Sequence, residues 1–290
     1  MAACDADRPP SDEADRKTVV DDLGRSISIP AQVRRVVTLA PSVTEVLYAA
    51  GGLSKLVGVS TADDYPPSVL ELPSFSALPL NFEAIVGLEP DLVLATTQVN
   101  NPRDAEVLEE MDVPTFFIQT QSLDDVLRNI RTVGSLVGTE VSARIVADSL
   151  GRIIEQLRSI TDSLSSRPRV LVLLSEEKLF SFGAGSYMHS LIELAGGQSI
   201  TAGIDHQVPV LSEEFVVQQN PDVIFGTFPE NIGAAELLFF HPEWSGVPAI
   251  KNELVFSIDP DLLLRAGPRT IDGTLEILAI LHPEIALTLR

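Results

Sequence analysis

Two stretches of this 290-residue chain share one pattern. Residues 81–96 read NFEAIVGLEPDLVLAT, and residues 212–227 read SEEFVVQQNPDVIFGT. Aligned without a gap, they place Glu83 on Glu214 and put a Pro-Asp pair before an apolar run in both. The chain also exceeds the usual single-domain length of about 100 to 200 residues. A helix-then-strand unit that occurs in both halves therefore predicts two lobes of similar build, each with its own core.

Both halves alternate short β-branched runs with segments of helical character. Capping boxes follow the first run at Ser42-Val-Thr-Glu45 and the fourth at Ser122-Leu-Asp-Asp125. Strand followed by capped helix, repeated, predicts an α/β fold with mostly parallel sheets in two Rossmann-like lobes. The expected strands are residues 36–40, 56–60, 91–96, 115–120, 169–175, 222–227 and 254–258. The later helices are expected near residues 186–195, 212–219 and 269–281.

Apolar residues recur at helical spacing between the two halves, from residue 139 to residue 165. This spacing predicts one long amphipathic helix. At about 1.5 Å per residue, some 25 residues span roughly 37 Å, enough to cross from one lobe to the other. We expect a ligand in the cleft between the lobes, at the carboxyl ends of the strands, and a small opening motion. The predicted parts are a tether (1–17), an N-terminal lobe (18–138), the connecting helix (139–165) and a C-terminal lobe (166–290).

The net charge of −21 comes from 20 basic and 41 acidic residues. This excess repels the phosphates of nucleic acid, so we expect no nucleic-acid partner. It favours basic partner surfaces, although adaptation to high salt produces the same composition. The sequence contains no uninterrupted run of about 18 apolar residues, so we predict no membrane-spanning helix.

Cys4 is the single cysteine, so the sequence predicts neither a disulfide framework nor a thiolate metal cluster. Ala2-Ala3-Cys4 resembles the end of a bacterial lipoprotein signal, in which small residues precede the cysteine that receives the lipid. The following residues are polar and include Pro9-Pro10, as in a disordered tether. We expect Cys4 to be lipidated; the alternative is an unmodified cysteine in a disordered tail.

Several ordered motifs carry a resemblance to a known family, from about Val19 to the C-terminus. They are VVTLAPSVTEVLYAAGGLSKLVGVSTADDYPP at 36–67, NFEAIVGLEPDLVLA at 81–95, HPEWSGVPAIKNELVFSID at 241–259 and RAGPRTIDG at 265–273. The chain resembles the helical-backbone periplasmic substrate-binding proteins of ABC importers, and within them the cobalamin-binding members. The resemblance implies a monomeric binding protein in the periplasm or at the cell surface, without a cofactor. Its expected cargo is cobalamin or a related corrinoid, with haem or a ferric siderophore as the alternative.

The resemblance also implies a role for the repeated glutamate. In this family a surface glutamate on each lobe docks onto arginines of the two permease subunits, which work with ATPase subunits. The matching positions are Glu83 and Glu214. Each is expected in the first turn of a helix, where a carboxylate is favoured by the helix dipole, so a plain capping role is the competing interpretation.

Ligand contacts are implied by the resemblance as well. Asp261 and Arg265 match a family pair that hydrogen-bonds the amide side chains of the corrin; the alternative is a local salt bridge. Arg269 is expected to anchor their loop. Phe180 matches a family aromatic, and Tyr187 is near enough to contribute, although either could be core. Three positions where the family carries large aromatic residues are occupied by small side chains, namely Ala62, Ala77 and either Thr96 or Thr97.

Two competing classes remain. Metal-binding relatives need several converging His and carboxylate ligands, whereas the four histidines here are widely spaced. We predict no bare-metal site; His241 and His282 are expected to be structural, and a single axial ligand from His189 or His206 stays open. An enzyme on the same bilobal fold is the remote alternative, because GxSxG and GxxxxGK[ST] are absent and acid pairs such as Asp21-Asp22 and Asp63-Asp64 read as solvated turns.

Overall fold

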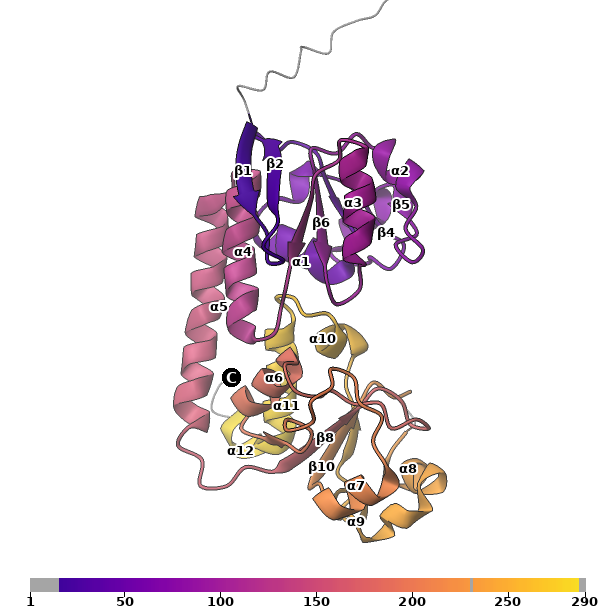
Figure 1. Cartoon of the computed structure of the whole chain (residues 1–290). Coiled ribbons are helices and arrows are strands. Elements are labelled where there is room, and N and C mark those ends of the chain that lie inside the picture. Colours follow the sequence, from indigo (N-terminus) through magenta and orange to yellow (C-terminus); the bar gives the residue numbers. More distant parts are fainter. Residues whose placement is uncertain (1–15, 230–231, 287–290) are drawn as a thin grey trace, which may run out of the picture. The chain divides into compact units, whose positions relative to one another are not determined.

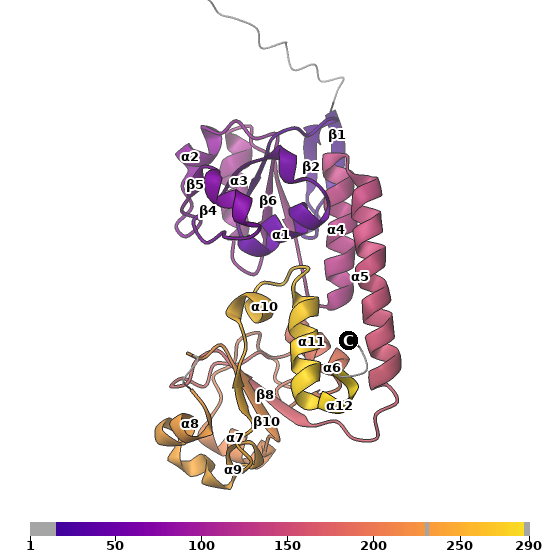
Figure 2. The same ribbon diagram turned by 180° about the vertical axis from the view of Figure 1, so that it is seen from behind.

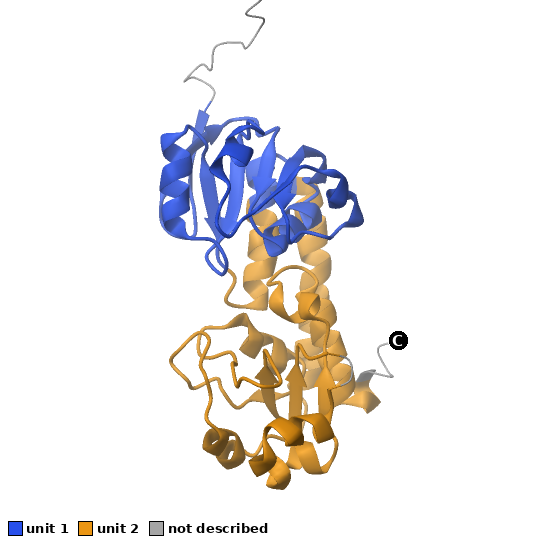
Figure 3. Ribbon diagram, turned by 90° about the vertical axis from the view of Figure 1, so that its right-hand side faces the viewer, with its two compact units in different colours: residues 1–119, 133–140 blue, residues 120–132, 141–290 orange. Residues whose placement is uncertain are grey.

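The computed structural model of the chain describes residues 16–229 and 232–286, which form two compact units (Figure 3). Unit 1 contains the described residues up to 119 together with 133–140, and unit 2 contains 120–132 and the described residues from 141 onward. Each unit is built around a parallel sheet with helices, which confirms the predicted α/β class.

The sheet of unit 1 has five parallel strands. In spatial order they are β5 (Ser74–Phe75), β4 (Leu56–Ser60), β3 (Val36–Thr38), β6 (Leu92–Thr96) and β7 (Thr115–Ile118). Val37, Val93 and Phe117 point towards α2 (Phe82–Val86) and α3 (Pro102–Glu110) in one apolar cluster. Val36, Leu92 and Leu94 alternate with them and are also buried. Burial on both faces explains why these strands read as continuous apolar runs.

An antiparallel hairpin precedes this sheet and was not predicted. It pairs β1 (Arg16–Val20) with β2 (Ser26–Pro30), so β1 begins inside the segment 1–17 that was expected to be a tether. Asp21 holds the turn, because its carboxylate accepts from the backbone N–H groups of Leu23 and Arg25 and pairs with the Arg25 guanidinium at 2.7 Å. The prediction of a solvated turn is wrong for Asp21, whose side chain is buried.

The sheet of unit 2 has four parallel strands with helices on both faces (Figures 1 and 2). In spatial order they are β11 (Val255–Ser257), β10 (Val223–Gly226), β8 (Arg169–Leu173) and β9 (Gln198–Ser199). Val170 and Val172 face α6 (Tyr187–Leu194) and α11 (Thr270–Leu281). Leu171 and Leu173 face the other layer. That layer contains α7 (Glu213–Gln219), α8 (Ala234–Phe240), η4 (Pro242–Gly246) and α9 (Pro248–Lys251).

Two long helices lie between the two sheets in the sequence. α4 spans Leu123–Val137, and α5 spans Glu140–Thr161 within the segment predicted as one long helix. Ion pairs at 2.9 Å, Arg131 with Asp148 and Arg158 with Asp124, join the first part of α4 to α5 inside unit 2. Exposed pairs of this kind add little stability. No helix in the described ranges is both long and apolar enough to cross a membrane.

One predicted capping box is confirmed and the other is wrong. Ser122 and Asp125 cap the start of α4 reciprocally: Asp125 N–H donates to Ser122 Oγ at 3.3 Å, and Ser122 N–H donates to Asp125 Oδ2 at 2.9 Å. Ser42 is not a cap, because α1 (Pro41–Ala49) begins one residue earlier, with Ala40 at the N-cap and proline in its first turn. A proline suits this position, since its missing N–H has no helical partner there anyway.

We predict that Ser122→Ala lowers the free energy of unfolding by about 1 kcal/mol, because it removes the cap of α4. Urea unfolding followed by far-UV circular dichroism measures the change. Ser42→Ala is the matched control, since the Ser42 side chain caps no helix. Equal effects of the two substitutions would contradict the assignment of the cap.

Candidate ligand-binding and docking residues

Three of the predicted ligand positions in unit 1 lie at one edge of its sheet. Ala62 follows β4, Ala77 follows β5 and Thr97 follows β6. Because the strands are parallel, their carboxyl ends meet at this edge, which is where open α/β sheets bind ligands. Ala62 is exposed, and the other two residues are half-buried. The structure thus brings the three residues to a common edge that presents small side chains.

Two buried polar residues that the sequence analysis did not identify shape this edge. Asn100 accepts from the backbone N–H of Thr96 at 3.0 Å and donates to the carbonyl of Leu39 at 3.1 Å, so it ties β6 to the end of β3. Asp63 accepts from the N–H and the hydroxyl of Ser60 at 3.0 and 2.5 Å. Asp63 is therefore buried, and the predicted solvated turn is wrong for it. Its spacing of three from a serine, typical of side chains that close a turn, was the available signal.

The remaining ligand candidates lie beyond the carboxyl ends of strands in unit 2. Phe180 follows β8 and is half-buried, and Asp261 and Arg265 belong to α10 (Pro260–Leu264) and its C-cap, after β11. Arg265 pairs with Asp261 at 2.8 Å, and Arg269 approaches the other carboxylate oxygen at 3.4 Å. Two guanidinium groups thus surround one carboxylate. Such a cluster offers both forked donors and an acceptor to a polar ligand.

Tyr187 supports this cluster from the core. Its side chain is buried, and its hydroxyl donates to the backbone carbonyl of Leu263 in α10. Burial raises the pKa of the phenol well above its ordinary range. The ring is therefore not available to a ligand here, and Tyr187 instead holds the segment between Asp261 and Arg265. The spacing of Tyr187 from Leu191 and Leu194, which marks a buried helix face, was the sequence signal for this role.

The two repeated glutamates occupy equivalent local positions. Both are exposed, in the first turn of α2 and of α7. The Asn81 side chain caps α2 at 3.1 Å, and the Ser212 hydroxyl caps α7 at 3.1 Å. The pKa of Glu214 is lowered, mainly by a hydrogen bond from its own backbone N–H and next by one from the Ser212 hydroxyl. The Glu214 carboxylate therefore stays ionised at neutral pH.

The histidines serve structural contacts in unit 2, with one exception. His189 uses both ring nitrogens, at 3.0 Å to Ser199 Oγ and 2.6 Å to the Gly183 carbonyl, and burial lowers its pKa. His282 is buried and lies 3.2 Å from the carbonyl of Gly196. His241 is buried between Glu213 and a backbone carbonyl. His206 is exposed in the loop before α7. Within residues 16–229 and 232–286, no three His, Cys, Asp or Glu side chains gather closely enough to hold a metal ion.

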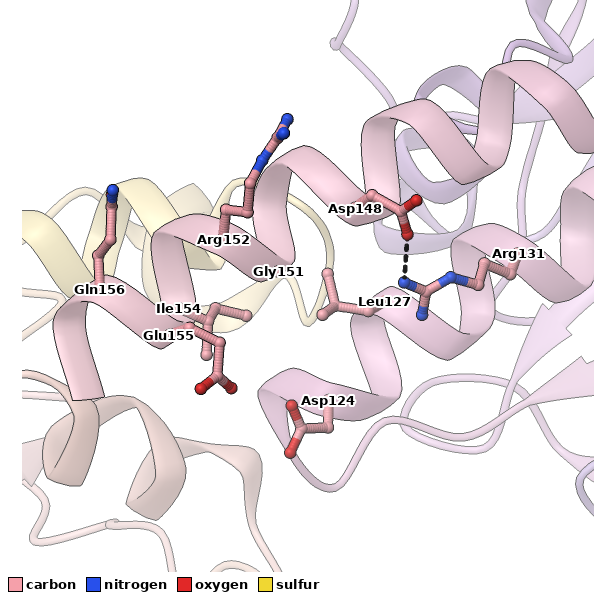
Figure 4. A pocket seen from close by; sticks show the side chains of 9 residues that line it. All are labelled: Asp124, Leu127, Arg131, Asp148, Gly151, Arg152, Ile154, Glu155 and Gln156. Carbon is pink, nitrogen blue, oxygen red and sulfur yellow. Dashed lines mark hydrogen bonds and ion pairs between the residues drawn. The ribbon is translucent and has the colours of Figure 1, made fainter. Parts of the chain in front are cut away.

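A pocket of about 520 Å³ lies away from all these candidates, between the first part of α4 and α5 (Figure 4). Leu127 and Ile154 supply apolar lining, and the Arg131–Asp148 pair closes one end. Charged side chains dominate the rest of its lining. The pocket contains none of the residues predicted to contact a ligand.

Comparison with known proteins identifies the class. The chain belongs to the periplasmic binding protein family, whose sequence pattern matches residues 36–262. An ABC transporter substrate-binding lipoprotein of Bacillus subtilis is 27% identical over 291 residues, covering 95% of this chain and 91% of the relative. The chain is accordingly a solute-binding protein of an ABC transporter, which implies permease and ATPase partners, and not an enzyme.

Three further matches are named after a ligand. A vitamin B12-binding protein of Vibrio cholerae is 31% identical over 250 residues, covering 86% of this chain and 89% of the relative. The crystal structure of the periplasmic vitamin B12-binding protein of that species has a TM-score of 0.74 at 29% identity, covering 88% of this chain and 98% of that one. A periplasmic heme-binding protein of Roseiflexus has a TM-score of 0.75 at 25% identity, with 86% and 98% covered. The molecules in these names, vitamin B12 and heme, are ligands that the proteins bind and not resident cofactors.

We predict that Ser212→Ala raises the pKa of Glu214 towards the ordinary value of a glutamate, because it removes one of the two donors. A carboxylate whose pKa is lower in the folded chain than in the unfolded chain stabilises the folded state. This stabilisation is fully present at a pH above the pKa of the unfolded chain, and it is lost as the pH falls through the pKa of the folded chain. Carbon-detected NMR titration of the glutamate side chains measures the shift. Asn81→Ala, which uncaps α2 instead, should leave the pKa of Glu214 unchanged.

Proposed function

We propose that this protein captures cobalamin or a related corrinoid outside the cytoplasm and delivers it to an ABC permease. One observation carries the choice of ligand: the 31% identity to a vitamin B12-binding protein extends over almost the whole of both chains. The Asp261–Arg265 pair in unit 2 agrees with it, since the peripheral amides of a corrin need both a donor and an acceptor.

The charged side chains at α10 would bind the ligand by exchanging their ion pairs with one another for hydrogen bonds to it. In this structure the Asp261 carboxylate engages Arg265 and Arg269. An incoming amide can accept from a guanidinium and donate to the carboxylate, so the polar groups stay hydrogen-bonded when water leaves. Tyr187 keeps α10 in place through its bond to Leu263 and limits the ordering required on binding.

Haem is the second candidate ligand. The similarity to a heme-binding protein at a TM-score of 0.75 favours it. The small side chains at Ala62, Ala77 and Thr97 leave few rings to stack on either macrocycle. If haem is bound through an axial histidine, His206 is the candidate, because both ring nitrogens of His189 are already engaged. A ferric siderophore, the remaining candidate, needs neither stacked rings nor an axial histidine.

Delivery would use the two exposed glutamates. We propose that Glu83 and Glu214 pair with basic residues of the two permease subunits, which sets orientation and encounter rate more than affinity. We also propose that the protein acts as a monomer held at the membrane by a lipid on Cys4, in keeping with the lipoprotein relative. Cys4 itself lies outside the described residues.

We predict that Asp261→Ala and Arg265→Ala each weaken binding of the ligand about tenfold or more, since each removes a polar group proposed to hydrogen-bond the ligand. Calorimetric titration with cyanocobalamin, cobinamide, haemin and a ferric siderophore identifies the ligand and measures the loss. Arg152→Ala, an exposed arginine on α5, is the control. Wild-type affinity in both variants would remove the pair from the site, and binding of haemin alone would replace the corrinoid assignment.

We predict that Glu83→Ala combined with Glu214→Ala leaves ligand affinity unchanged and impairs uptake by cells or by proteoliposomes that contain the permease complex. The physical reason is loss of the two carboxylates that orient the loaded protein. Glu89→Ala combined with Glu253→Ala removes the same charge from other exposed positions and should transport normally. Undiminished uptake by the first double variant would contradict the docking assignment.

A further inference from the structure

One end of unit 2 exposes aromatic side chains to solvent. Phe239, near the end of α8, is 80% exposed, and Phe240 packs against it edge to face with ring centroids 5.6 Å apart. Their helix is anchored by Leu237, which is fully buried. Two residues along a helix correspond to a rotation of about 200°, so Phe239 points away from the core that Leu237 enters. A large ring in this position does not contribute to the core of the unit.

The helix that carries these rings is joined to α7, which carries the proposed docking glutamate. His241, the C-cap of α8, contacts Glu213, the first residue of α7, at 2.7 Å between Nδ1 and Oε1. Its other ring nitrogen lies 2.8 Å from the backbone carbonyl of Glu176. Both ring nitrogens of His241 are therefore engaged with oxygen atoms of other segments. This contact joins the end of the aromatic helix to the start of the helix that carries Glu214.

An apolar residue on α7 extends the patch. Val217 is 41% exposed and lies three residues after Glu214, on the same side of the helix. Glu214 and Val217 on α7 and Phe239 and Phe240 on α8 are thus solvent-accessible residues of two helices that the His241–Glu213 contact joins, and we call these four residues the α7–α8 face. Figure 1 shows the two helices in the same layer of unit 2.

The charge of this face restricts what can cover it. α7, α8 and η4 carry four glutamates and no lysine or arginine. Glu214 in particular stays ionised, since its pKa is lowered. A second copy of a chain with a net charge of −21 would bring like charges together, and an anionic lipid surface would be repelled as well. The complementary partner presents an apolar pocket bordered by basic side chains.

We propose that the α7–α8 face is an apolar anchor for the permease, with Phe239 inserted into a pocket of the subunit whose basic residue pairs with Glu214. The inference rests on the proposed docking of Glu214 and assigns the affinity to a different residue. An aromatic ring buried at the centre of an interface contributes strongly to affinity, whereas charge pairs at the rim mainly speed encounter. His241 holds the two helices in register before the partner arrives, which lowers the ordering needed on docking.

The test measures association of the purified chain, in the presence of cyanocobalamin, with its permease–ATPase complex in lipid nanodiscs, by biolayer interferometry at two salt concentrations. Phe239→Ser should weaken binding about tenfold or more, through faster dissociation and with little dependence on salt. Glu214→Ala should slow association, and its effect should shrink at high salt. Ile145→Ser on α5, which removes a residue 63% exposed, should bind as the wild type does. Circular dichroism and the thermal midpoint should show that Phe239→Ser stays folded.

The outcomes separate the two proposals. Wild-type affinity of Phe239→Ser, together with a clear defect in Glu214→Ala, would overturn the apolar anchor and leave the docking assignment standing. Normal binding by Glu214→Ala would overturn the docking assignment. Two other outcomes would overturn the inference, because each would show that the α7–α8 face binds something other than the permease. One is Phe239-dependent dimerisation of the wild type in sedimentation. The other is Phe239-dependent binding to vesicles that contain 30% anionic lipid. Failure of the wild type to bind the complex would remove both proposals.

Discussion

Parallel strand pairing is the constraint on which the other features of this protein depend. Every strand of the two main sheets runs in the same direction as its neighbours, so all polar groups that follow the strands emerge at one edge of each sheet. The same pairing requires helices on both faces and leaves no solvated face for a binding surface. Functional residues are thereby confined to the loops beyond the carboxyl ends and to the outer sides of the covering helices. Asp261 illustrates the first location, and Phe239 illustrates the second.

Residues around the α10 cluster show how the core positions a polar site. Asp261 and Arg265 come from a short helix that forms few hydrogen bonds of its own, and the buried hydroxyl of Tyr187 fixes that helix from inside unit 2. A phenol held in this way is costly to bury without its partner, so the bond is a firm attachment. The Ser60–Asp63 contact acts similarly on the loop that carries Ala62 in unit 1.

The sequence predicted the main strands well, but it did not predict the hairpin outside the main sheet or which side chains are exposed, and the reasons are physical. β4 begins and ends at the predicted residues because a β-branched run buried on both faces has a strong signal. The β1–β2 hairpin was missed because β1 alternates exposed and half-buried residues and lies outside the main sheet. For Tyr187 the sequence left a ligand contact and a core position open, because its position near a family aromatic favoured the first and its helical spacing the second; the structure places the side chain in the core. The exposure of Phe239 depends on which side of α8 meets the core, and the apolar run AAELLFF does not specify that side.

The His241 ring stacks on the indole of Trp244, with centroids 4.3 Å apart and planes 17° from parallel. Trp244 is the single tryptophan of the chain and is buried. The tryptophan emission of this protein therefore comes from one indole, which lies against the ring that joins α8 to α7. The molecule therefore carries a built-in optical probe next to the surface proposed to meet the permease, and a change there can be observed without a label.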